Sequence, residues 1–336
     1  MKSFCEILSI KHPIIQAPMA GGLVDGGFVA QACECGFLGS IPSGYLSLTQ
    51  TYNFIKSVQA KTTKPFALNI FVDYTYYGES KIAKPKDIVE LERGFIENPS
   101  EYFVVEKAPL VSELIEVAVT LKVPCISTTF GLLSPEHIDA LKRYKIKILT
   151  TINSVYELEV ALNHQQADVV VFQNALAGGH KGGFSPLPHS ENLEILDSLK
   201  SLGSEVPCVL AGGVVTKEDI KEALTQGFDG VQIGSGFLCT KESKANPSYK
   251  EALLKGKETH FSESITGKTA RGLKNALSSR EASLNLGFPF MYYATSSLRK
   301  LAKDHGDSNY QSLWCGAGVD RITKEQSLQE YAESLV

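Results

Sequence analysis

The first 240 residues alternate between short apolar runs and longer amphipathic segments. The apolar runs are continuous rather than interrupted by polar residues, which is typical of strands buried on both faces of a parallel sheet. Amphipathic segments of helical periodicity separate the runs, and Ser134, Asn153 and Thr216 precede three of them as expected N-caps. The pattern predicts eight strands, at residues 12–19, 37–44, 64–72, 123–131, 146–152, 167–174, 206–214 and 228–238.

Eight strand–helix units in series, without a second cluster of strands, favour an α/β fold of the TIM (β/α)8 barrel type. An open doubly wound sheet is the alternative, and it would place a GxGxxG phosphate loop after the first strand. Here that turn reads MAGG, at residues 19–22. The glycine loops instead follow the sixth, seventh and eighth strands, so the barrel is the better interpretation.

The strand–helix rhythm breaks twice. Residues 73–108 are polar, charged and rich in tyrosine, and they are too long for an ordinary βα connection. Their aromatic residues argue against the alternative of a disordered linker. The rhythm is lost again after residue 240. We therefore expect a barrel of residues 1–72 and 109–240, with a cap or substrate subdomain and C-terminal extension formed by residues 73–108 and 241–336.

Composition narrows the functional classes. The chain has 336 residues, of which 43% are hydrophobic and 21% charged, and this is ordinary globular composition. A net charge of -4 and a pI near 6.0 argue against nucleic-acid binding. No apolar run is long enough to span a bilayer, and the N-terminus lacks the apolar core of a signal peptide, so we expect a cytoplasmic protein without a membrane partner.

The cysteines and histidines predict neither a disulfide framework nor a metal site. The seven cysteines are scattered, odd in number and without a CxxC pair. No HExxH or similar spacing is present among the histidines. The expected chemistry therefore uses no metal ion.

The candidate active loop follows the sixth predicted strand. Residues 168–183 read DVVVFQNALAGGHKGG, an apolar run that ends at Gln173 and a loop in which two glycine pairs flank His180 and Lys181. Paired glycines permit a close approach of the backbone to a flat or anionic ligand, and a histidine between them could titrate near neutral pH. The alternative interpretation is a tight turn with a surface histidine.

Two more features point to a ligand at the same end of the barrel. The glycine loops at residues 211–213 and 232–236 follow the seventh and eighth strands, where many barrels bind a phosphate group. Asn69, Gln173 and Gln232 place amides at the ends of three apolar strands. Each alone is as consistent with a satisfied core amide, but together they favour a ring-shaped ligand with a phosphate tail.

Several motifs in the same order along the chain resemble the nitronate monooxygenase family, formerly called 2-nitropropane dioxygenases, and in particular its class I members. These motifs are PIIQAPMAGG, KPFALNIFV, FQNALAGGHKGG, CVLAGGV, DGVQIGSGFL and YYATSSLRKLA…LWCGAG. The resemblance implies a TIM barrel with a cap, an FMN cofactor, and oxidation of alkyl nitronates such as propionate 3-nitronate with O2. It places His180 at the substrate, and it assigns FMN contacts to Ala17, Met19, Asn69, Gln173, Gly178, Gly213, Gln232, Gly234 and Ser235.

The chain departs from the family pattern at two places. The loop that usually reads QGxEAGGH has Asn174 in place of the glycine and Leu176 in place of the acidic residue. The C-terminal motif YPEVHYLT becomes FPFMYYAT, with Tyr292 in place of the histidine. These changes leave the expected flavin site intact but affect the substrate side. Tyr292 and Tyr293 could donate hydrogen bonds to nitro oxygens or pack as aromatic cap residues.

Other functions remain open at this stage. One alternative is an NAD(P)H-dependent FMN reductase of the enoyl-acyl-carrier-protein reductase or quinone reductase type, which shares the GGH loop. Another is a flavin-free lyase or isomerase that uses only the phosphate site. The expected partners are a small anionic substrate and O2, and a homodimer is compatible with the sequence.

Overall fold

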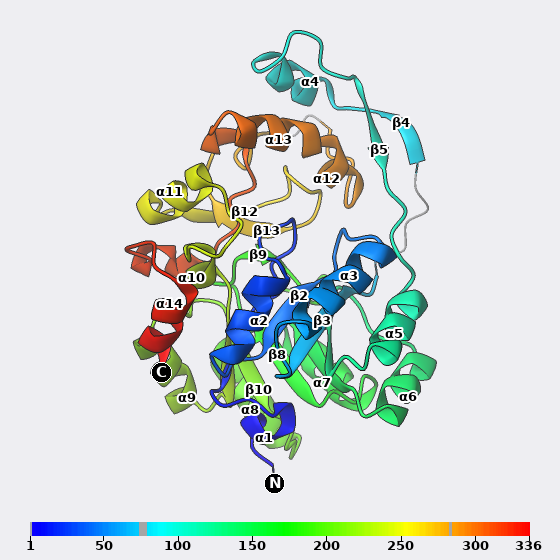
Figure 1. The fold of residues 1–336 in the computed structure, drawn as a ribbon, viewed down its shortest axis with the longest axis vertical. Coiled ribbons are helices and arrows are strands. Elements are labelled where there is room, and N and C mark those ends of the chain that lie inside the picture. Colours follow the sequence, from blue (N-terminus) through cyan, green and yellow to red (C-terminus); the bar gives the residue numbers. More distant parts are fainter. Residues whose placement is uncertain (1, 74–78, 282–283) are drawn as a thin grey trace.

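The computed structural model describes residues 2–73, 79–281 and 284–336, and its centre is an eight-stranded parallel sheet (Figure 1). The strands lie in the order β1-β11-β10-β8-β7-β6-β3-β2. The two strands at the ends of this order, β1 and β2, are joined beside Leu38 by backbone hydrogen bonds from Gln16 N to Leu38 O (2.9 Å) and from Leu38 N to Ile14 O (3.0 Å). These bonds close the sheet into a barrel. The predicted (β/α)8 barrel is confirmed, with strands β1 (Ile14–Gln16), β2 (Gly39–Pro42), β3 (Phe66–Phe71), β6 (Cys125–Thr129), β7 (Lys147–Ile152), β8 (Val169–Gln173), β10 (Cys208–Ala211) and β11 (Gly230–Ile233).

Burial on both faces explains why the strand sequences are uniformly apolar. In β8, Val169 and Val171 face the inside of the barrel, whereas Val170 and Phe172 pack outward against the helices. The next inward position is Gln173, because side chains alternate along a strand. Its polar side chain therefore stands at the carboxyl end of the strand, on the inner side of the barrel mouth.

A ring of helices surrounds the sheet, and its last member comes from the far end of the chain. After β11 only the short α10 (Ser235–Leu238) follows, and α14 (Leu328–Leu335) contacts α2, α9 and α10. Tyr331 Oη donates to the carbonyl oxygen of Val215 at 2.7 Å and ties α14 to this position. The other ring helices are α2 (Gly26–Glu34), α3 (Leu48–Gln59), α5 (Val111–Thr120), α6 (Pro135–Arg143), α7 (Val155–Asn163), α8 (Asn192–Ser201) and α9 (Lys217–Gln226), while α1 (Phe4–Leu8) packs into the inner cluster of the barrel.

Two of the three predicted helix caps are confirmed. Ser134 and Thr216 accept the expected bonds from backbone N–H groups at the starts of α6 and α9. The prediction for Asn153 is wrong, because Ser154 caps α7 instead. The Asn153 side chain is engaged elsewhere, in the loop that carries His180.

Segments from the insertion and from the tail lie over the barrel mouth and share an apolar cluster of their own (Figure 1). Ile88 and Phe103 come from the insertion, and Met291 and Leu298 come from the tail. The exact boundaries of the predicted subdomain stay a prediction. The tail contributes to both parts of the molecule, because its α12 and α13 lie in the upper part whereas α14 belongs to the ring of helices around the barrel. The elements of this upper part are β4 (Glu79–Ala83), α4 (Lys86–Arg93), β5 (Tyr102–Val105), α11 (Pro247–Lys255), α12 (Phe290–Ala294), α13 (Ser296–Asp304) and the 3-10 turn η1 (Ser308–Tyr310).

A small antiparallel sheet connects the tail to the active loop. It consists of β12 (Thr259–Ser262), β13 (Ala270–Leu273) and the two-residue β9 (Gly179–His180). A second 3-10 turn, η2 (Ala317–Arg321), leads from the mouth toward α14. The loop after β8 is therefore held both by the barrel strand that precedes it and by its pairing with β13 of the tail.

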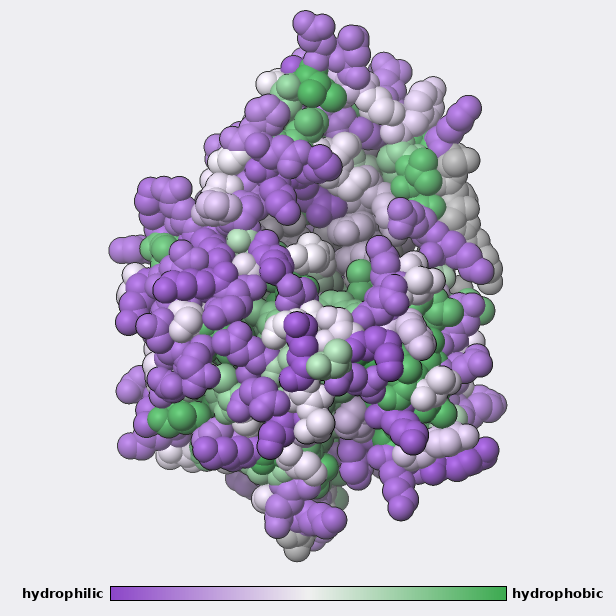
Figure 2. All heavy atoms as spheres, viewed as in Figure 1, coloured by the Kyte–Doolittle hydropathy of each residue, from purple (hydrophilic) through white to green (hydrophobic). Residues whose placement is uncertain are grey.

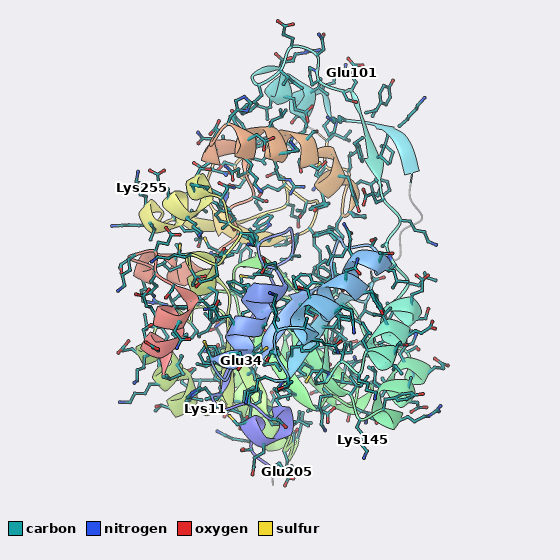
Figure 3. The ribbon with its side chains drawn as sticks, viewed as in Figure 1. Lys11, Glu34, Glu101, Lys145, Glu205 and Lys255 are labelled. Carbon is teal, nitrogen blue, oxygen red and sulfur yellow. The ribbon has the colours of Figure 1, made fainter. Side chains whose placement is uncertain are left out.

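The outer surface is largely hydrophilic, with a recess between the upper part and the barrel on the face that Figure 2 shows. Charged side chains such as Glu101, Lys145 and Glu205 project from the periphery (Figure 3). Among the described residues, no helix combines the length and the apolar character needed to cross a membrane. In the same ranges, no group of three or more His, Cys, Asp or Glu side chains is arranged to hold a metal ion.

A buried ion pair within the insertion is bonded to the tail through one hydroxyl group. Lys84 Nζ lies 2.7 Å from Glu92 Oε2, and the two side chains are only 3% and 1% exposed. Ser297 on α13 completes the cluster, accepting a bond from Lys84 Nζ at 2.8 Å and donating to Glu92. Removing one charge would leave the other buried without its counter-ion, which is far more costly than removing both.

We expect Lys84→Met to lower the free energy of unfolding by about 3–5 kcal/mol, because Glu92 would stay buried as an unpaired carboxylate. The double variant Lys84→Met with Glu92→Leu should recover most of this loss. Denaturant unfolding of the single and double variants measures both values. A single variant within about 1 kcal/mol of the parent would show that the pair does not hold the upper part together.

Candidate active site

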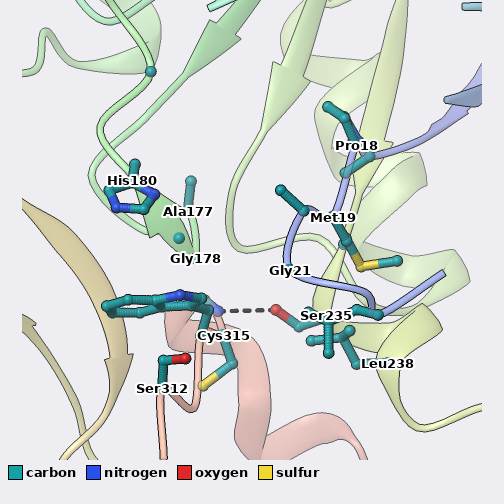
Figure 4. Close-up of a pocket in the computed structure, with 18 of the residues that line it drawn as sticks. Pro18, Met19, Gly21, Ala177, Gly178, His180, Ser235, Leu238, Ser312 and Cys315 are labelled. Atoms are coloured by element: carbon teal, nitrogen blue, oxygen red, sulfur yellow. Dashed lines mark hydrogen bonds between the residues drawn. The ribbon is translucent and has the colours of Figure 1, made fainter. Parts of the chain in front are cut away.

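One cavity of about 590 Å³ lies at the carboxyl ends of the barrel strands, beneath the upper part of the molecule (Figure 4). This volume falls in the range of sites for small ligands and cofactors, which is roughly 300–1,000 Å³. The structure brings almost all of the predicted site residues together there. The cavity is lined by Ala17, Met19, Asn69, Gln173, Gly178, His180, Gly213, Gln232, Gly234, Ser235 and Tyr292. Tyr293 is not among the lining residues, and it packs against the apolar cluster of the upper part.

The His180 loop is held by backbone pairing and by one amide. His180 pairs with Ala270 in the sheet of β9 and β13. Gln173 Nε2 donates to the carbonyl oxygen of His180 at 2.9 Å, and its Oε1 accepts from Gly182 N at 2.7 Å. For Gln173 the interpretation as a satisfied amide is therefore correct, and the bonds it makes are the ones that place His180 in the cavity.

A buried carboxylate fixes the far side of the same loop. Glu157 is fully buried and accepts backbone N–H bonds from Asn153 (2.5 Å), Phe184 (2.7 Å) and Ser185 (2.5 Å). A Cβ atom on Gly183 would collide with the side chains of Glu157 and Asn153. Only glycine permits this close packing, so the second glycine pair of the motif serves the loop's anchorage.

His180 lies in an aromatic enclosure and is neutral. Its ring centroid is 5.9 Å from those of Phe130 and Phe288 and 5.5 Å from that of Trp314. Burial, together with the positive charges of Lys268 and Arg299, lowers the pKa of His180 to about 3. The imidazole therefore carries no charge at neutral pH.

The hydrogen bonds of Thr266 indicate which ring nitrogen of His180 carries the proton. His180 Nε2 lies 2.9 Å from Thr266 Oγ1, and that hydroxyl can donate to the carbonyl oxygen of Lys268 at 3.2 Å. With the hydroxyl proton used there, Nε2–H is the donor to Thr266. This network assigns a lone pair to Nδ1, which can accept a proton or a hydrogen bond from a ligand.

The other two predicted amides differ in their surroundings. Asn69 is buried, and its Nδ2 donates to Ser127 Oγ (2.8 Å) and Thr129 Oγ1 (2.9 Å) on the neighbouring strand. Gln232 stands on β11, half-buried beside the cavity, and no side-chain bond to it occurs within the described ranges. Of the three amides, Gln232 is thus the one whose donor and acceptor are available to a bound ring.

The glycine loops after β10 and β11 offer backbone N–H groups. Gly212 and Gly213 have positive φ angles of 114° and 77°, so this turn favours glycine. Arg321 donates to the carbonyl oxygen of Gly213, and the N–H of Val214 points the opposite way because the peptide is trans. Ser235 faces the same region and accepts a bond from Gly316 N at 2.8 Å (Figure 4). The arrangement suits a phosphate group.

The charges around the cavity have one sign. Four basic side chains line it, and no acidic side chain does so within the described part of the chain. Arg299 is half-buried, whereas the lysines are exposed and belong to the rim: Lys244, Lys300 and Lys303. A cavity of this kind attracts anions and disfavours cationic ligands.

Most of the tail residues that line the cavity were not predicted from the sequence. Ser312, Trp314 and Cys315 line the cavity from the segment that leads to η2. A Cβ atom on Gly178 would collide with the backbone of Cys315, so this glycine permits the tail to pack against the active loop. The LWCGAG motif was the available signal, because small residues in an irregular segment often mark a close approach of two backbones.

Of the departures from the family pattern, Tyr292 lines the cavity, but the two in the loop after β8 do not face the ligand space. Asn174 is buried and bonds within its own loop, accepting from Leu176 N at 3.0 Å, and Leu176 is 47% exposed. Neither residue lines the cavity. Arg271 is also structural, since its Nε donates to the carbonyl oxygen of Ala175 at 3.0 Å and its guanidinium stacks on Phe261. The expectation that Asn174 and Leu176 alter the substrate side is not supported.

Comparison with known proteins agrees with this geometry. A probable nitronate monooxygenase of Bacillus subtilis (strain 168) is 32% identical over 100% of this chain and 98% of its own length. One from Staphylococcus haemolyticus (strain JCSC1435) is 31% identical, covering 98% of this chain and 95% of that protein. The crystal structure of nitroalkane oxidase from Streptomyces ansochromogenes matches with a TM-score of 0.84 and 28% identity, over 97% of this chain and 95% of that one.

FabK from Thermotoga maritima shares the fold, with a TM-score of 0.76 and 22% identity, over 100% of this chain and 95% of that one. That degree of identity supports the architecture but no particular activity. The model of the nitronate monooxygenase family, in contrast, matches residues 2–336. A chain that matches this model from end to end, and that builds one basic, glycine-rimmed cavity around His180, belongs to the nitronate monooxygenase family and is an oxidoreductase.

Proposed function

We propose that this protein binds FMN and oxidises small alkyl nitronates with O2, with the nitronate as the reductant of the flavin. The observation that carries the proposal is the character of the cavity. It combines glycine-rich backbone at the carboxyl ends of β10 and β11, basic side chains, a neutral His180 and, among the described residues, no acidic side chain. Such a site suits a phosphate-bearing ring together with a small anion.

The donor set fits FMN. The backbone around Gly213 and Gly234, with the N–H of Val214, would hold the phosphate. Gln232 would meet the edge of the ring, and the turn at Ala17 and Met19 would lie against it. Bound there, FMN supplies the redox chemistry, accepting electrons from the substrate and passing them to O2.

The protein's own residues would bind and orient the nitronate. His180 cannot serve as a cation, because its imidazole is neutral, but its Nδ1 can accept a proton or a hydrogen bond at the substrate. Phe130, Phe288 and Trp314 pack around that ring and limit its solvation. A weak base suits a substrate that arrives already as the anion, so the site favours nitronates over neutral nitroalkanes.

The proposal is tested by anaerobic reduction of the FMN-loaded enzyme. Propionate 3-nitronate should bleach the flavin absorbance, whereas NADH and NADPH should leave it unchanged. Bleaching by a pyridine nucleotide but not by nitronate would make the protein a reductase instead. Purified protein that is colourless and does not take up added FMN would overturn the flavin assignment altogether.

Gly234 offers a separate test of where FMN binds. Its φ of -115° is accessible to any residue, and a Cβ atom there would lie 3.5 Å from Ala17 Cβ, an ordinary contact. We expect Gly234→Ala to bind FMN normally. Gly234→Leu should lose roughly ten- to hundredfold in affinity, equivalent to ~1–3 kcal/mol of overpacking. Fluorescence titration of the apo-protein measures both, and equal affinities would contradict the placement.

The half-buried, neutral His180 should also make folding stability sensitive to acid. In the unfolded chain the imidazole of His180 has a pKa near 6.5, whereas in the folded protein its pKa is about 3. Between these pH values only the unfolded chain binds the proton. Stability from this residue is therefore complete above pH 6.5 and declines as the pH falls, by roughly 2 kcal/mol at pH 5. Denaturant unfolding at pH 7.5 and pH 5 should show a smaller acid loss in His180→Gln than in the parent. Equal losses would place His180 in a more solvated setting.

A further inference from the structure

Arg299 is part of a three-layer stack that joins the barrel to the upper part. The rings of Tyr45, from the loop after β2, and Tyr292, from α12, are parallel within 5° with centroids 3.9 Å apart. Arg299 Cζ lies 4.5 Å from the centroid of the Tyr292 ring. Tyr45 occupies one face of that ring at van der Waals distance, so the guanidinium of Arg299 covers the other face.

Hydrogen bonds fix the plane of the guanidinium. Arg299 Nη2 donates to the carbonyl oxygen of Tyr292 at 2.6 Å, and Nε donates to Thr295 Oγ1 at 3.2 Å. Thr295 is fully buried, and its hydroxyl donates to the carbonyl oxygen of Ile265 at 2.8 Å. These contacts of the described residues engage two of the five N–H donors of Arg299, and the side chain is ordered before any ligand arrives.

The other cations near the cavity are placed differently. Lys300 pairs with Asp304 at 2.6 Å and Lys244 pairs with Asp25 at 3.0 Å, and both lysines are more than half exposed. Exposed charges of this kind contribute little directional binding. Lys268 lies over the Phe130 ring and is not among the lining residues. Arg299 is therefore the half-buried, oriented cation that lines the cavity.

We propose that Arg299 binds the planar two-oxygen anion of the substrate, and that the Tyr45–Tyr292 stack positions its guanidinium for this contact. The inference rests on the proposed function and names the recognition element of the same site. A nitronate group is planar, with both oxygens on one nitrogen, and it matches the guanidinium fork as a carboxylate does. Arg299 also supplies the positive charge that the neutral His180 cannot supply.

The ligand class follows from this geometry. Planar anions that present two oxygens from one atom, such as nitronates, carboxylates and nitrate, can accept two parallel N–H bonds. Chloride carries the same charge but has no pair of oxygens. The site should therefore prefer nitrate to chloride, even though neither reacts.

The test uses sodium nitrate and isothermal titration calorimetry on the purified protein. We expect Arg299→Met to weaken nitrate binding by about tenfold or more, and Arg299→Lys, which keeps the charge but loses the fork, to weaken it by a similar factor. Arg143→Met removes the same charge from the exposed end of α6 and should leave nitrate affinity unchanged. In turnover with a nitronate, the Arg299 variants should raise KM far more than they lower kcat.

Tyr292 distinguishes positioning from mere packing. Tyr292→Phe keeps the stacked ring and should bind nitrate as the parent does, whereas Tyr292→Leu should weaken it severalfold at an unchanged FMN content. Parent-like nitrate affinity in both Arg299 variants would overturn the proposal. The result is independent of catalysis: if nitronates fail to reduce the flavin while Arg299→Met still loses nitrate, the oxidation proposal fails and the anion site stands.

Discussion

The antiparallel pairing of Gly179 and His180 with Ala270 and Arg271 is the contact on which the site depends. It takes a loop that begins at the end of a barrel strand and attaches it to a strand of the tail, nearly one hundred residues later in the chain. From below, Gln173 holds the same loop through its amide. Together these two attachments place His180 in the cavity, among the aromatic rings of Phe130, Phe288 and Trp314.

The neutrality of His180 divides the tasks within the cavity. An uncharged imidazole at neutral pH can accept a proton or a hydrogen bond, but it cannot balance an anion. The balancing charge comes from Arg299, which is held by Tyr292 and Thr295. Separation of the two roles means that neither residue must change its protonation state merely to bind the substrate.

The sequence predicts the barrel and most of the cavity because both follow from local patterns. Continuous apolar runs mark the eight strands, and the residues that end them, such as Gln173 and Gln232, reach the mouth by the alternation of side chains along a strand. Asn153 shows the limit of local reasoning, since a cap-forming residue bonds to a distant loop instead. Tail residues such as Trp314 and Arg299 were not predicted, because only long-range packing brings them to the mouth.

The position of α14 has a consequence for how the chain is made. This helix fills the gap in the ring between α9 and α2, and its buried residues include Leu328, Tyr331 and Leu335. Until the ribosome has synthesised these residues, a nascent barrel exposes an apolar groove along its side. The ring of helices around the barrel therefore closes only after α14 has been synthesised, when nearly the whole chain is available.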